Sequence, residues 1–234
     1  MSSPSTADSR DALFARIREA LANPAISHAH EHPVHPANVT PEATLSQWLP
    51  AVGATFEEQL DLFARNSVDL KTEFKVVASA EEAAAHLNAL ATENKWTKVA
   101  THRGSINDAV AAQLTTPVYR VDDQFDKVQL ETCDAGITEC EALVAQTGSV
   151  CLTAPSSGGR SLSVLPPHHV VLARRSQLIA DLPAAYALLK TKYGAKGYPS
   201  FISFTTGPSR TGDIERILVL GAHGPKKLTV LLLP

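Results

Sequence analysis

Two polar loops near the C-terminus hold side chains suited to binding a negatively charged ligand. The first loop, from Gly207 to Asp213, offers the hydroxyls of Ser209 and Thr211 and the guanidinium of Arg210. Together with free backbone N–H groups at the start of a helical turn, these groups can bind a carboxylate or a phosphate. The loop is not a Walker loop, because no Gly-Lys-Ser or Gly-Lys-Thr ends it. We therefore predict an anion site of another kind at this loop.

The same loop also has a purely structural interpretation. Ser209 or Thr211 would then cap the helical turn, and Asp213 would complement its dipole. Asp213 would alternatively pair with Arg210 and fix the orientation of the guanidinium. The loop chemistry by itself leaves these interpretations open.

The second loop, from Gly221 to Lys226, lies between two apolar runs that are typical of buried strands. His223 in this loop can act as a general acid or base, or donate a hydrogen bond to an oxyanion, and Lys226 adds positive charge. A histidine in a turn can equally be structural, since geometry rather than residue type makes a catalyst. We take His223 as a candidate catalytic residue and Lys226 as a candidate anion ligand.

A third polar cluster flanks a predicted strand at residues 149–153. A Thr-Gly-Ser segment opens this strand, and a Gly-Gly-Arg segment follows it. Paired glycines allow a ligand to approach the backbone, and the arginine can bind an anion through two parallel hydrogen bonds. An ordinary hairpin loop would use the same residues. The predicted anion-binding residues of all three clusters are Thr147, Gly148, Ser149, Gly158, Gly159, Arg160, Gly207, Ser209, Arg210, Thr211, Asp213 and Lys226.

Two acidic residues, Glu139 and Glu141, lie near a predicted element boundary. Carboxylates in such a place can act as a nucleophile or as a general base. Solvated acids in the first turn of a helix would produce the same pattern. Both residues are candidate catalytic groups beside His223.

Metal-binding patterns in the chain are weak. Four histidines lie between His28 and His35, but alternate residues of an extended chain point to opposite sides, so they cannot converge without a specific turn. The three cysteines are spaced C-x6-C-x10-C, which fits neither an iron–sulfur cluster nor structural zinc. We predict no metal site and no iron–sulfur cluster, and we expect the cysteines to be buried.

The elements that must position these loops follow an α/β pattern. A helix at residues 8–21 precedes a proline-rich linker, and a short helix is expected at 45–52. Capping signals at Thr55 and Ser79 mark the starts of two further helices. Strand–helix alternation then implies parallel pairing with right-handed crossovers. The remaining expected elements are strands at 74–78, 96–100, 118–121, 149–153, 162–165, 170–173, 201–205, 217–220 and 228–233, and helices at 106–114 and 181–193.

We therefore predict one main α/β domain at residues 45–234, with a mixed, mostly parallel sheet flanked by helices. A helical N-terminal arm and its linker would occupy residues 1–44. The segment Pro166–His169 is expected to form a turn that leaves His169 exposed.

Composition excludes several classes of protein. Apolar residues make up 44% of the chain and charged residues 19%, which is ordinary globular usage. A net charge of -3 without a basic block argues against nucleic acid or an anionic membrane as the main partner. No apolar run is long enough to cross a bilayer, and the N-terminus lacks the apolar core of a signal peptide. A cytoplasmic location is expected.

Four segments of the chain resemble the lactate-utilization protein C family, whose members consist largely of a LUD domain. Within these segments the patterns GPSRT-x-DIE and HGPK come in that order near the C-terminus, whereas residues 1–70 hold no matching motif. The segments are GITECEALVAQTGSV from residue 136, GGRSLSVLPPHHVVL from 158, FTTGPSRTGDIE from 204 and LGAHGPKKLTVLLL from 220.

The resemblance implies a fold similar to the NagB/RpiA/CoA-transferase class. It also implies participation, with two partner proteins that carry iron–sulfur clusters, in the oxidation of L-lactate to pyruvate. CoA-transferase-like relatives use a glutamate nucleophile, but nothing in the sequence assigns that role to Glu139 or Glu141.

The leading hypothesis is a subunit of an L-lactate-oxidising complex. Arg160, Ser209, Arg210 and His223 would surround one pocket for a small carboxylate or a phosphate-bearing cofactor. Two alternatives stay open. The chain could be an independent acyl or CoA transferase or phosphosugar isomerase, or a regulatory or scaffold subunit that binds a metabolite without chemistry.

Overall fold

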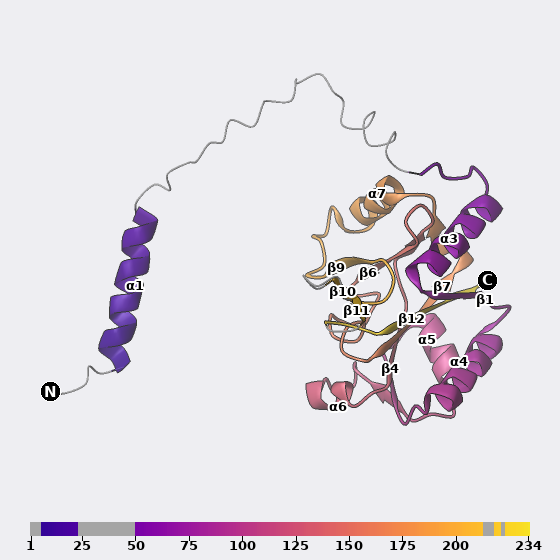
Figure 1. Cartoon of the computed structure of the whole chain (residues 1–234), viewed down its shortest axis with the longest axis horizontal. Helices are drawn as coiled ribbons and strands as arrows, with labels where there is room; N and C mark the ends of the chain where they lie inside the picture. The colour runs from indigo at the N-terminus through magenta and orange to yellow at the C-terminus, as the bar shows by residue number, and fades with distance from the viewer. Residues whose placement is uncertain (1–5, 23–49, 213–217, 221–222) are drawn as a thin grey trace, which may run out of the picture. The chain divides into compact units, whose positions relative to one another are not determined.

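The computed structural model describes residues 6–22, 50–212, 218–220 and 223–234 of the 234-residue chain. The chain divides into two units, Met1–Trp48 and Leu49–Pro234. In the first unit one helix is described, α1 (Thr6–Ala22), and it contains the helix predicted at 8–21. The second unit is the α/β body (Figure 1). Most of the helix predicted at 45–52 lies outside the described residues, and residues 50–52 are not helical.

Six parallel strands in the described residues form the main sheet, in the order β1-β12-β7-β4-β2-β3. The central strands β4, β7 and β12 are almost wholly buried and largely apolar, which is typical of a sheet buried on both faces. The prediction of a mostly parallel sheet is confirmed. The strands are β1 (Glu73–Val76), β2 (Val99–Thr101), β3 (Val118–Arg120), β4 (Ala135–Thr138), β7 (His168–Arg174) and β12 (Lys227–Leu233).

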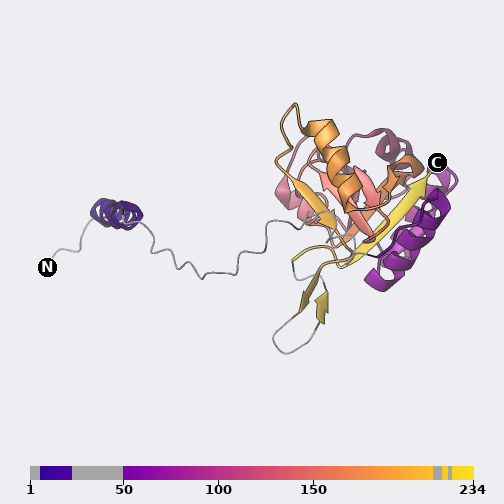
Figure 2. The same cartoon turned by 90° about the horizontal axis from the view of Figure 1, so that it is seen from above.

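A second sheet of four strands has the order β8-β5-β6-β9. Its strands β5–β6 and β6–β9 pair antiparallel, whereas β5–β8 pair parallel. A separate antiparallel pair, β10 and β11, projects from the body in Figure 2. The bounds are β5 (Ala142–Val144), β6 (Ser149–Thr153), β8 (Leu178–Ile179), β9 (Ile202–Thr205), β10 (Arg210–Gly212) and β11 (Leu218–Leu220).

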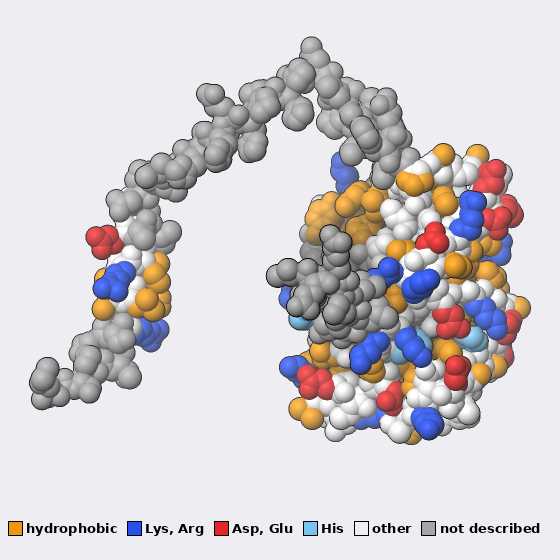
Figure 3. Space-filling model, viewed as in Figure 1, with side chains coloured by type: hydrophobic (Ala, Val, Ile, Leu, Met, Phe, Trp, Pro, Cys, Tyr) orange, Lys and Arg blue, Asp and Glu red, His pale blue; other side chains and the backbone are white. Residues whose placement is uncertain are grey.

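The surface of the α/β body carries charges of both signs. Basic and acidic side chains are interspersed on the face that Figure 3 shows. Within the ranges that the structure describes, no helix is long and apolar enough to cross a membrane.

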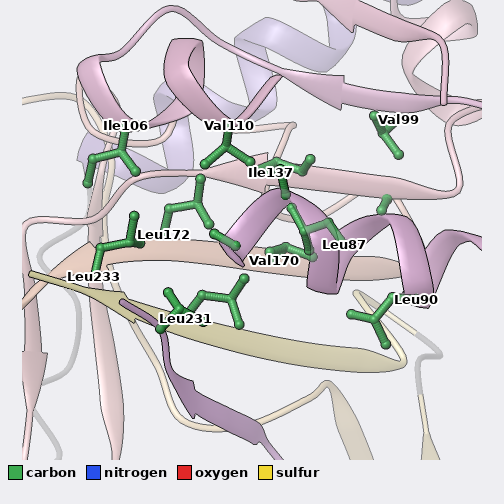
Figure 4. Close-up of a cluster of buried hydrophobic side chains, with 14 residues drawn as sticks. Leu87, Leu90, Val99, Ile106, Val110, Ile137, Val170, Leu172, Leu231 and Leu233 are labelled. Carbon is green, nitrogen blue, oxygen red and sulfur yellow. The ribbon is translucent and has the colours of Figure 1, made fainter. Parts of the chain in front are cut away.

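Helices cover both faces of the main sheet. On one face, α4 (Ala80–Asn94) and α5 (Ser105–Ala111) place leucine, isoleucine and valine side chains against β4, β7 and β12 (Figure 4). On the other face lie α3 (Phe56–Leu70) and the four-stranded sheet. The outer face of that sheet packs on α7 (Leu182–Tyr193). A short helix, α6 (Lys127–Glu131), precedes β4, and a 3-10 turn, Arg175–Gln177, follows β7.

The capping signals read from the sequence are present. Thr55 and Glu58 form a reciprocal capping box at the start of α3. The side chain of Ser79 accepts a hydrogen bond from the backbone N–H of Glu82 at the start of α4. These contacts satisfy N–H groups that a helix start leaves without partners.

Two local predictions were wrong. Residues 162–165 form a turn and not a strand, because the backbone N–H groups of Val164 and Leu165 both donate to the carbonyl of Ser161, at 3.1 and 2.9 Å. His169 is buried, because β7 begins at His168 and continues inside the body. Residues 210–212 form the strand β10, which pairs with β11, whereas the helical turn predicted after this loop falls on residues 213–217, outside the described residues.

Candidate functional site

The connection from β4 to β5 carries the chain from the main sheet to the four-stranded sheet. Glu139, Cys140 and Glu141 make this connection. It leaves the carboxyl end of β4, whose neighbours are β2 and β7. After β2 the next strand, β3, is added on the side of β2 that faces away from β4. After β4 the next strand of the same sheet, β7, is added on the side that faces away from β2, so the direction in which strands are added reverses between β2 and β4. Open α/β sheets bind ligands beside the carboxyl ends of strands at such reversals.

Glu139 is anchored to the start of α5. Its Oε1 accepts hydrogen bonds from the backbone N–H groups of Ile106 and Asn107, at 2.9 and 3.2 Å. The backbone N–H of Glu139 donates to Nε2 of His102 at 3.3 Å, so the ring proton is on Nδ1, which lies 2.8 Å from the Arg103 carbonyl oxygen. One carboxylate oxygen of Glu139 therefore caps a helix.

Glu141 lies at the centre of a buried polar network. Its carboxylate accepts hydrogen bonds from the hydroxyls of Thr153 and Tyr193, at 2.6 and 2.5 Å, and from Nζ of Lys192 at 2.6 Å. Burial alone would raise the pKa of Glu141, but the three donors outweigh burial and lower the pKa below its usual value. The carboxylate is therefore ionised at neutral pH.

A pocket of about 480 Å³ opens beside these two glutamates. Its walls come from the β4–β5 connection, the loop after β6, the turn after β7 and the helix α7. A pocket of this size with converging polar groups is within the range of small-molecule sites. Its polar lining residues are Glu139, Glu141, Ser156, Ser176, Gln177 and Lys192. We call this space the glutamate pocket.

A smaller pocket of about 150 Å³ joins the two predicted C-terminal loops. Gly207 and Ser209 from the first loop and His223 from the second line it together with Ser163 and His169. The backbone N–H of Ser209 donates to the carbonyl of Pro225 at 2.9 Å, which ties the loops together. We call this space the His223 pocket.

Two buried groups of the His223 pocket were not foreseen. The hydroxyl of Ser163 is buried and has no hydrogen-bond partner among the described residues. His169 Nε2 lies 2.9 Å from the Thr138 hydroxyl, and burial lowers the pKa of His169 to about 3. At neutral pH this histidine is uncharged, so it can exchange hydrogen bonds with a ligand but adds no charge.

Comparison with known families decides which group of proteins the chain resembles. A family model described as the LUD domain matches residues 60–233. The chain belongs to the LUD domain family. Lactate utilization protein C of Shouchella clausii is 36% identical over 118 residues, which are 49% of this chain and 52% of that protein. The protein of the same name from Bacillus subtilis is 34% identical over 122 residues, 50% of each chain.

This LUD-domain chain therefore spans about half the length of the curated relatives that it matches. The predicted resemblance to the lactate-utilization protein C family is confirmed. A crystal structure of a DUF162 family protein from Deinococcus radiodurans superposes with a TM-score of 0.59 at 21% identity, over 78% of this chain and 100% of that one. At this identity the match shows a shared fold.

The other predicted anion-binding residues make contacts in different parts of the domain. Arg160 donates to the carbonyl of Ser200 at 3.1 Å, whereas the guanidinium of Arg210 contacts the carbonyl of Leu70, which ends α3. The two guanidiniums thus bind different parts of the body. Their sharing of one pocket stays a prediction.

The segment Thr147–Ser149 is linked to the first C-terminal loop by hydroxyl groups. The Ser149 hydroxyl lies 2.7 Å from both the Thr147 hydroxyl and the Thr206 hydroxyl. Gly148 has a φ of +64° and packs on α3, where a Cβ would come within 2.8 Å of Asn66. The segment therefore supports the loop from Gly207.

The Gly158–Gly159 segment packs against His102, the residue that follows β2. Gly158 has a φ of +63°, and a Cβ at this position would collide with His102. Gly159 has a φ of +106° and open space beside it.

Thr211 lies in β10, and Lys226 lines a different pocket from His223. Asp213 lies outside the described residues.

The residues considered as metal ligands are the three cysteines and the histidines between His28 and His35. Among the residues that the structure describes, no three His, Cys, Asp or Glu side chains cluster as a metal site would require. The histidines from His28 to His35 lie outside those residues. Cys133, Cys140 and Cys151 are buried in three separate apolar clusters. Burial raises the pKa of Cys151 to about 11, so its thiol is protonated.

The partners of the two glutamates were missed by sequence reasoning. Thr153 reaches Glu141 because β5 and β6 pair antiparallel, and a hairpin between them was a possible signal. Lys192 and Tyr193 come from the last turn of α7, about fifty residues away in sequence. Their contact depends on how α7 packs, which local patterns do not show.

Proposed function

We propose that this LUD-domain chain is a cytoplasmic component of a system that oxidises L-lactate to pyruvate together with iron–sulfur partner proteins. The observations that carry the proposal are the LUD-domain match and the sequence similarity to relatives named lactate utilization protein C. Because the chain spans half of those relatives, the proposal assigns it a role in the system and not a complete activity.

The His223 pocket supports binding of a small carboxylate. Its volume of about 150 Å³ equals about five water molecules at ~30 Å³ each, which suits a ligand of lactate or pyruvate size. The unpartnered Ser163 hydroxyl and the hydroxyl of Ser209 are donors of the kind that bind carboxylate oxygens. The adjacent loop carries Arg210, whose guanidinium lies beside Gly207.

Growth on L-lactate tests the role. A strain that lacks this gene and every other lactate dehydrogenase should fail to grow on L-lactate as sole carbon source and grow normally on pyruvate. The wild-type gene should restore growth, and a gene with Ser163→Ala and Ser209→Ala should restore it poorly, while Ser203→Ala, outside the pocket, serves as the control. Normal growth of the deletion strain on L-lactate would refute the role.

The third hypothesis, a regulatory or scaffold subunit, predicts a different result in the reconstituted system. An Arg210→Ala variant would lose ligand binding and still support full turnover of L-lactate. Loss of both binding and turnover favours a direct part in the reaction.

The glutamate pocket favours a second candidate function, an acyl or CoA transferase. Both glutamates line a space of about 480 Å³, and Oε2 of Glu139 makes no hydrogen bond among the described residues. In this chemistry a carboxylate oxygen attacks an acyl-CoA thioester carbonyl, an anhydride forms and CoA thiolate leaves. Purified protein incubated with acyl-CoA should then form a hydroxylamine-sensitive adduct that Glu139→Gln abolishes. No adduct with any common acyl-CoA would exclude this function.

A further inference from the structure

A separate polar pocket lies at the amino ends of the strands of the main sheet, whereas the glutamate pocket lies at the carboxyl end of β4. The separate pocket has a volume of about 180 Å³ and lies where β2, β4, β7 and β12 begin. The two pockets are therefore at opposite ends of β4. The residues that line the separate pocket are Asn94, Trp96, Asp134, Pro167, His168, Lys226 and Lys227. We call it the Lys226 pocket.

His168 lines this pocket and carries a buried acceptor without a hydrogen-bond partner among the described residues. The Thr229 hydroxyl donates to Oε2 of Glu73 at 2.9 Å, so its oxygen accepts the proton of His168 Nε2 at 2.8 Å. Nδ1 of His168 therefore carries a lone pair. The residue is 4% exposed, and Nδ1 has no hydrogen-bond partner among the described residues. A buried polar atom of this kind needs a partner from a ligand or from water.

The series of hydrogen bonds that fixes this tautomer extends to the surface. Oε1 of Glu73 lies 2.9 Å from Nε2 of His86, on the edge of the sheet at β1. The second carboxylate oxygen is occupied by the Thr229 hydroxyl. Burial and the nearby Lys227 lower the pKa of His168 to about 4, so the ring is neutral at neutral pH.

Two lysines bring positive charge to the same pocket. The backbone N–H groups of Lys226 and Lys227 both donate to the carbonyl of Pro167, at 2.8 and 3.3 Å, which holds them beside the start of β7. Nζ of Lys227 donates to Oδ1 of Asn94 at 2.6 Å, and the Lys226 side chain is exposed. Both ammonium groups can therefore reach an anion at the rim.

The acidic residue of the pocket does not cancel this charge through a direct pair. Oδ2 of Asp134 accepts three hydrogen bonds, from the backbone and hydroxyl of Thr97 at 2.6 and 2.9 Å and from the backbone of Lys98 at 3.2 Å. This carboxylate is committed to the start of β2. The ion pairs formed by the described residues include none between Asp134 and a lysine.

An aromatic wall limits the ligand further. The Trp96 ring packs edge-on against the His168 ring, with centroids 5.1 Å apart and an interplanar angle of 86°. A volume of about 180 Å³ equals about six water molecules at ~30 Å³ each, which suits a small organic anion. The site thus combines one neutral acceptor, two cations, one carboxylate that binds Thr97 and Lys98, and an apolar wall in a small space.

We propose that the Lys226 pocket binds a small hydroxycarboxylate. The carboxylate pairs with Lys226 and Lys227, the hydroxyl donates to Nδ1 of His168, and the carbon skeleton contacts Trp96. The inference goes beyond the proposed function, because none of the residues that line the Lys226 pocket lines the glutamate pocket or the His223 pocket. It gives the domain a second ligand site at the amino ends of the strands.

Tryptophan emission tests the site directly, because the chain has two tryptophans, Trp48 and Trp96. In a full-length Trp48→Phe protein, L-lactate should change the Trp96 emission saturably. Acetate has the charge without the hydroxyl and should bind about tenfold more weakly, as the loss of about one hydrogen bond implies. Inorganic phosphate distinguishes a general oxyanion site, since it carries a hydroxyl but no carbon skeleton.

Variants locate the response in the Trp48→Phe protein. Lys226→Gln should weaken L-lactate binding about tenfold, whereas Lys190→Gln, an exposed lysine on α7, should leave it unchanged. Ser209→Ala should also leave it unchanged, which separates this site from the His223 pocket. The proposal is overturned if L-lactate gives no saturable change, if acetate or phosphate binds as tightly, or if Lys226→Gln binds like the parent protein.

Discussion

Nζ of Lys192 lies 2.6 Å from Oε2 of Glu141, although the glutamate side chain is 3% exposed and the lysine side chain 53% exposed. The ion pair thus joins a buried anion to a cation that is half in solvent. It ties the last turn of α7 to the connection between the two sheets. The buried partner, and not the exposed one, should therefore dominate the energetics.

Glu141→Gln should lower the free energy of unfolding at pH 7 by about 2–3 kcal/mol, because three donors lose an ionised acceptor. The folded-state pKa of Glu141 is lowered, so its contribution is present above the unfolded pKa of about 4.3 and is lost as pH falls through the folded pKa. Urea unfolding at pH 7 and at pH 4 should show the gap between wild type and variant shrinking on acidification. A gap that stays constant would mean that the carboxylate charge contributes nothing.

Lys192→Met provides the matched comparison for the same ion pair. It should cost about 1 kcal/mol, since an exposed lysine contributes little and the hydroxyls of Thr153 and Tyr193 still bind the carboxylate. Lys190→Met, on the same helix, should change stability by less than about 0.5 kcal/mol. A cost for Lys192→Met equal to that of Glu141→Gln would contradict the unequal roles.

His169 should make the domain less stable in mild acid. Burial, and then the neighbouring His168, lower its folded-state pKa to about 3, whereas the unfolded value is about 6.5. The unfolded state therefore binds a proton that the folded state does not. The unfolding free energy should fall as pH drops below about 6.5, by up to about 1.4 kcal/mol per pH unit for this residue.

The measurement compares urea unfolding of wild type and His169→Gln between pH 7 and pH 5. Glutamine can still exchange a hydrogen bond with the Thr138 hydroxyl, and it does not titrate. The variant should have the flatter pH dependence even if it is less stable at pH 7. Parallel curves would show that His169 binds protons equally in the folded and unfolded states, which would contradict the lowered folded-state pKa.

Gly104 and Glu139 should be energetically coupled. Gly104 has an extended backbone, with φ at -177°, so alanine there meets no backbone strain, but its Cβ would collide with Oε1 of Glu139. Gly104→Ala should displace the carboxylate from the N–H groups of Ile106 and Asn107 and cost about 1–2 kcal/mol. In a Glu139→Ala background the same change should be nearly neutral. A double-mutant cycle of unfolding free energies measures this coupling, and additive effects would refute it.

The arrangement of helices and strands could be predicted where local patterns determine it. A capping box at Thr55, an N-cap at Ser79 and long apolar runs placed α3, α4 and most strands close to where they lie. The strand predicted at residues 162–165 is wrong because their alternation of apolar and polar residues resembles that of a strand. In the structure these residues form a turn, and Leu162 packs in a small cluster with Ala100 and Cys133. Local alternation does not distinguish these two outcomes.

The candidate sites were only partly predictable for a different reason. Ser209 and His223 lie in loops close in sequence, and a backbone hydrogen bond to Pro225 joins them, so their proximity has a local origin. The partners of Glu141 and the two buried histidines depend on how distant elements pack. Two adjacent histidines after two prolines suggested a turn, but each ring pairs with a threonine hydroxyl on a neighbouring strand. That pairing requires the strand order, which sequence patterns did not supply.

Gly158→Ala should be more damaging than Gly197→Ala, although both glycines have left-handed backbones, with φ at +63° and +88°. Alanine at Gly197 meets open space, so it pays only backbone strain, about 1–3 kcal/mol. At Gly158 the new Cβ would also collide with Cβ of His102, which lies next to the backbone and cannot rotate away. Because Nε2 of His102 accepts the backbone N–H of Glu139, the collision should also shift the glutamate.

Urea unfolding and an assay of the glutamate pocket together check this expectation. Gly158→Ala should lower the unfolding free energy by at least about 1 kcal/mol more than Gly197→Ala. If the glutamate pocket forms an acyl adduct, Gly158→Ala should reduce it while Gly197→Ala leaves it intact, because only the first variant displaces His102. Equal stability of the two variants would show that the loop from Gly158 moves freely away from His102, and that this loop does not hold the carboxyl end of β2 in place.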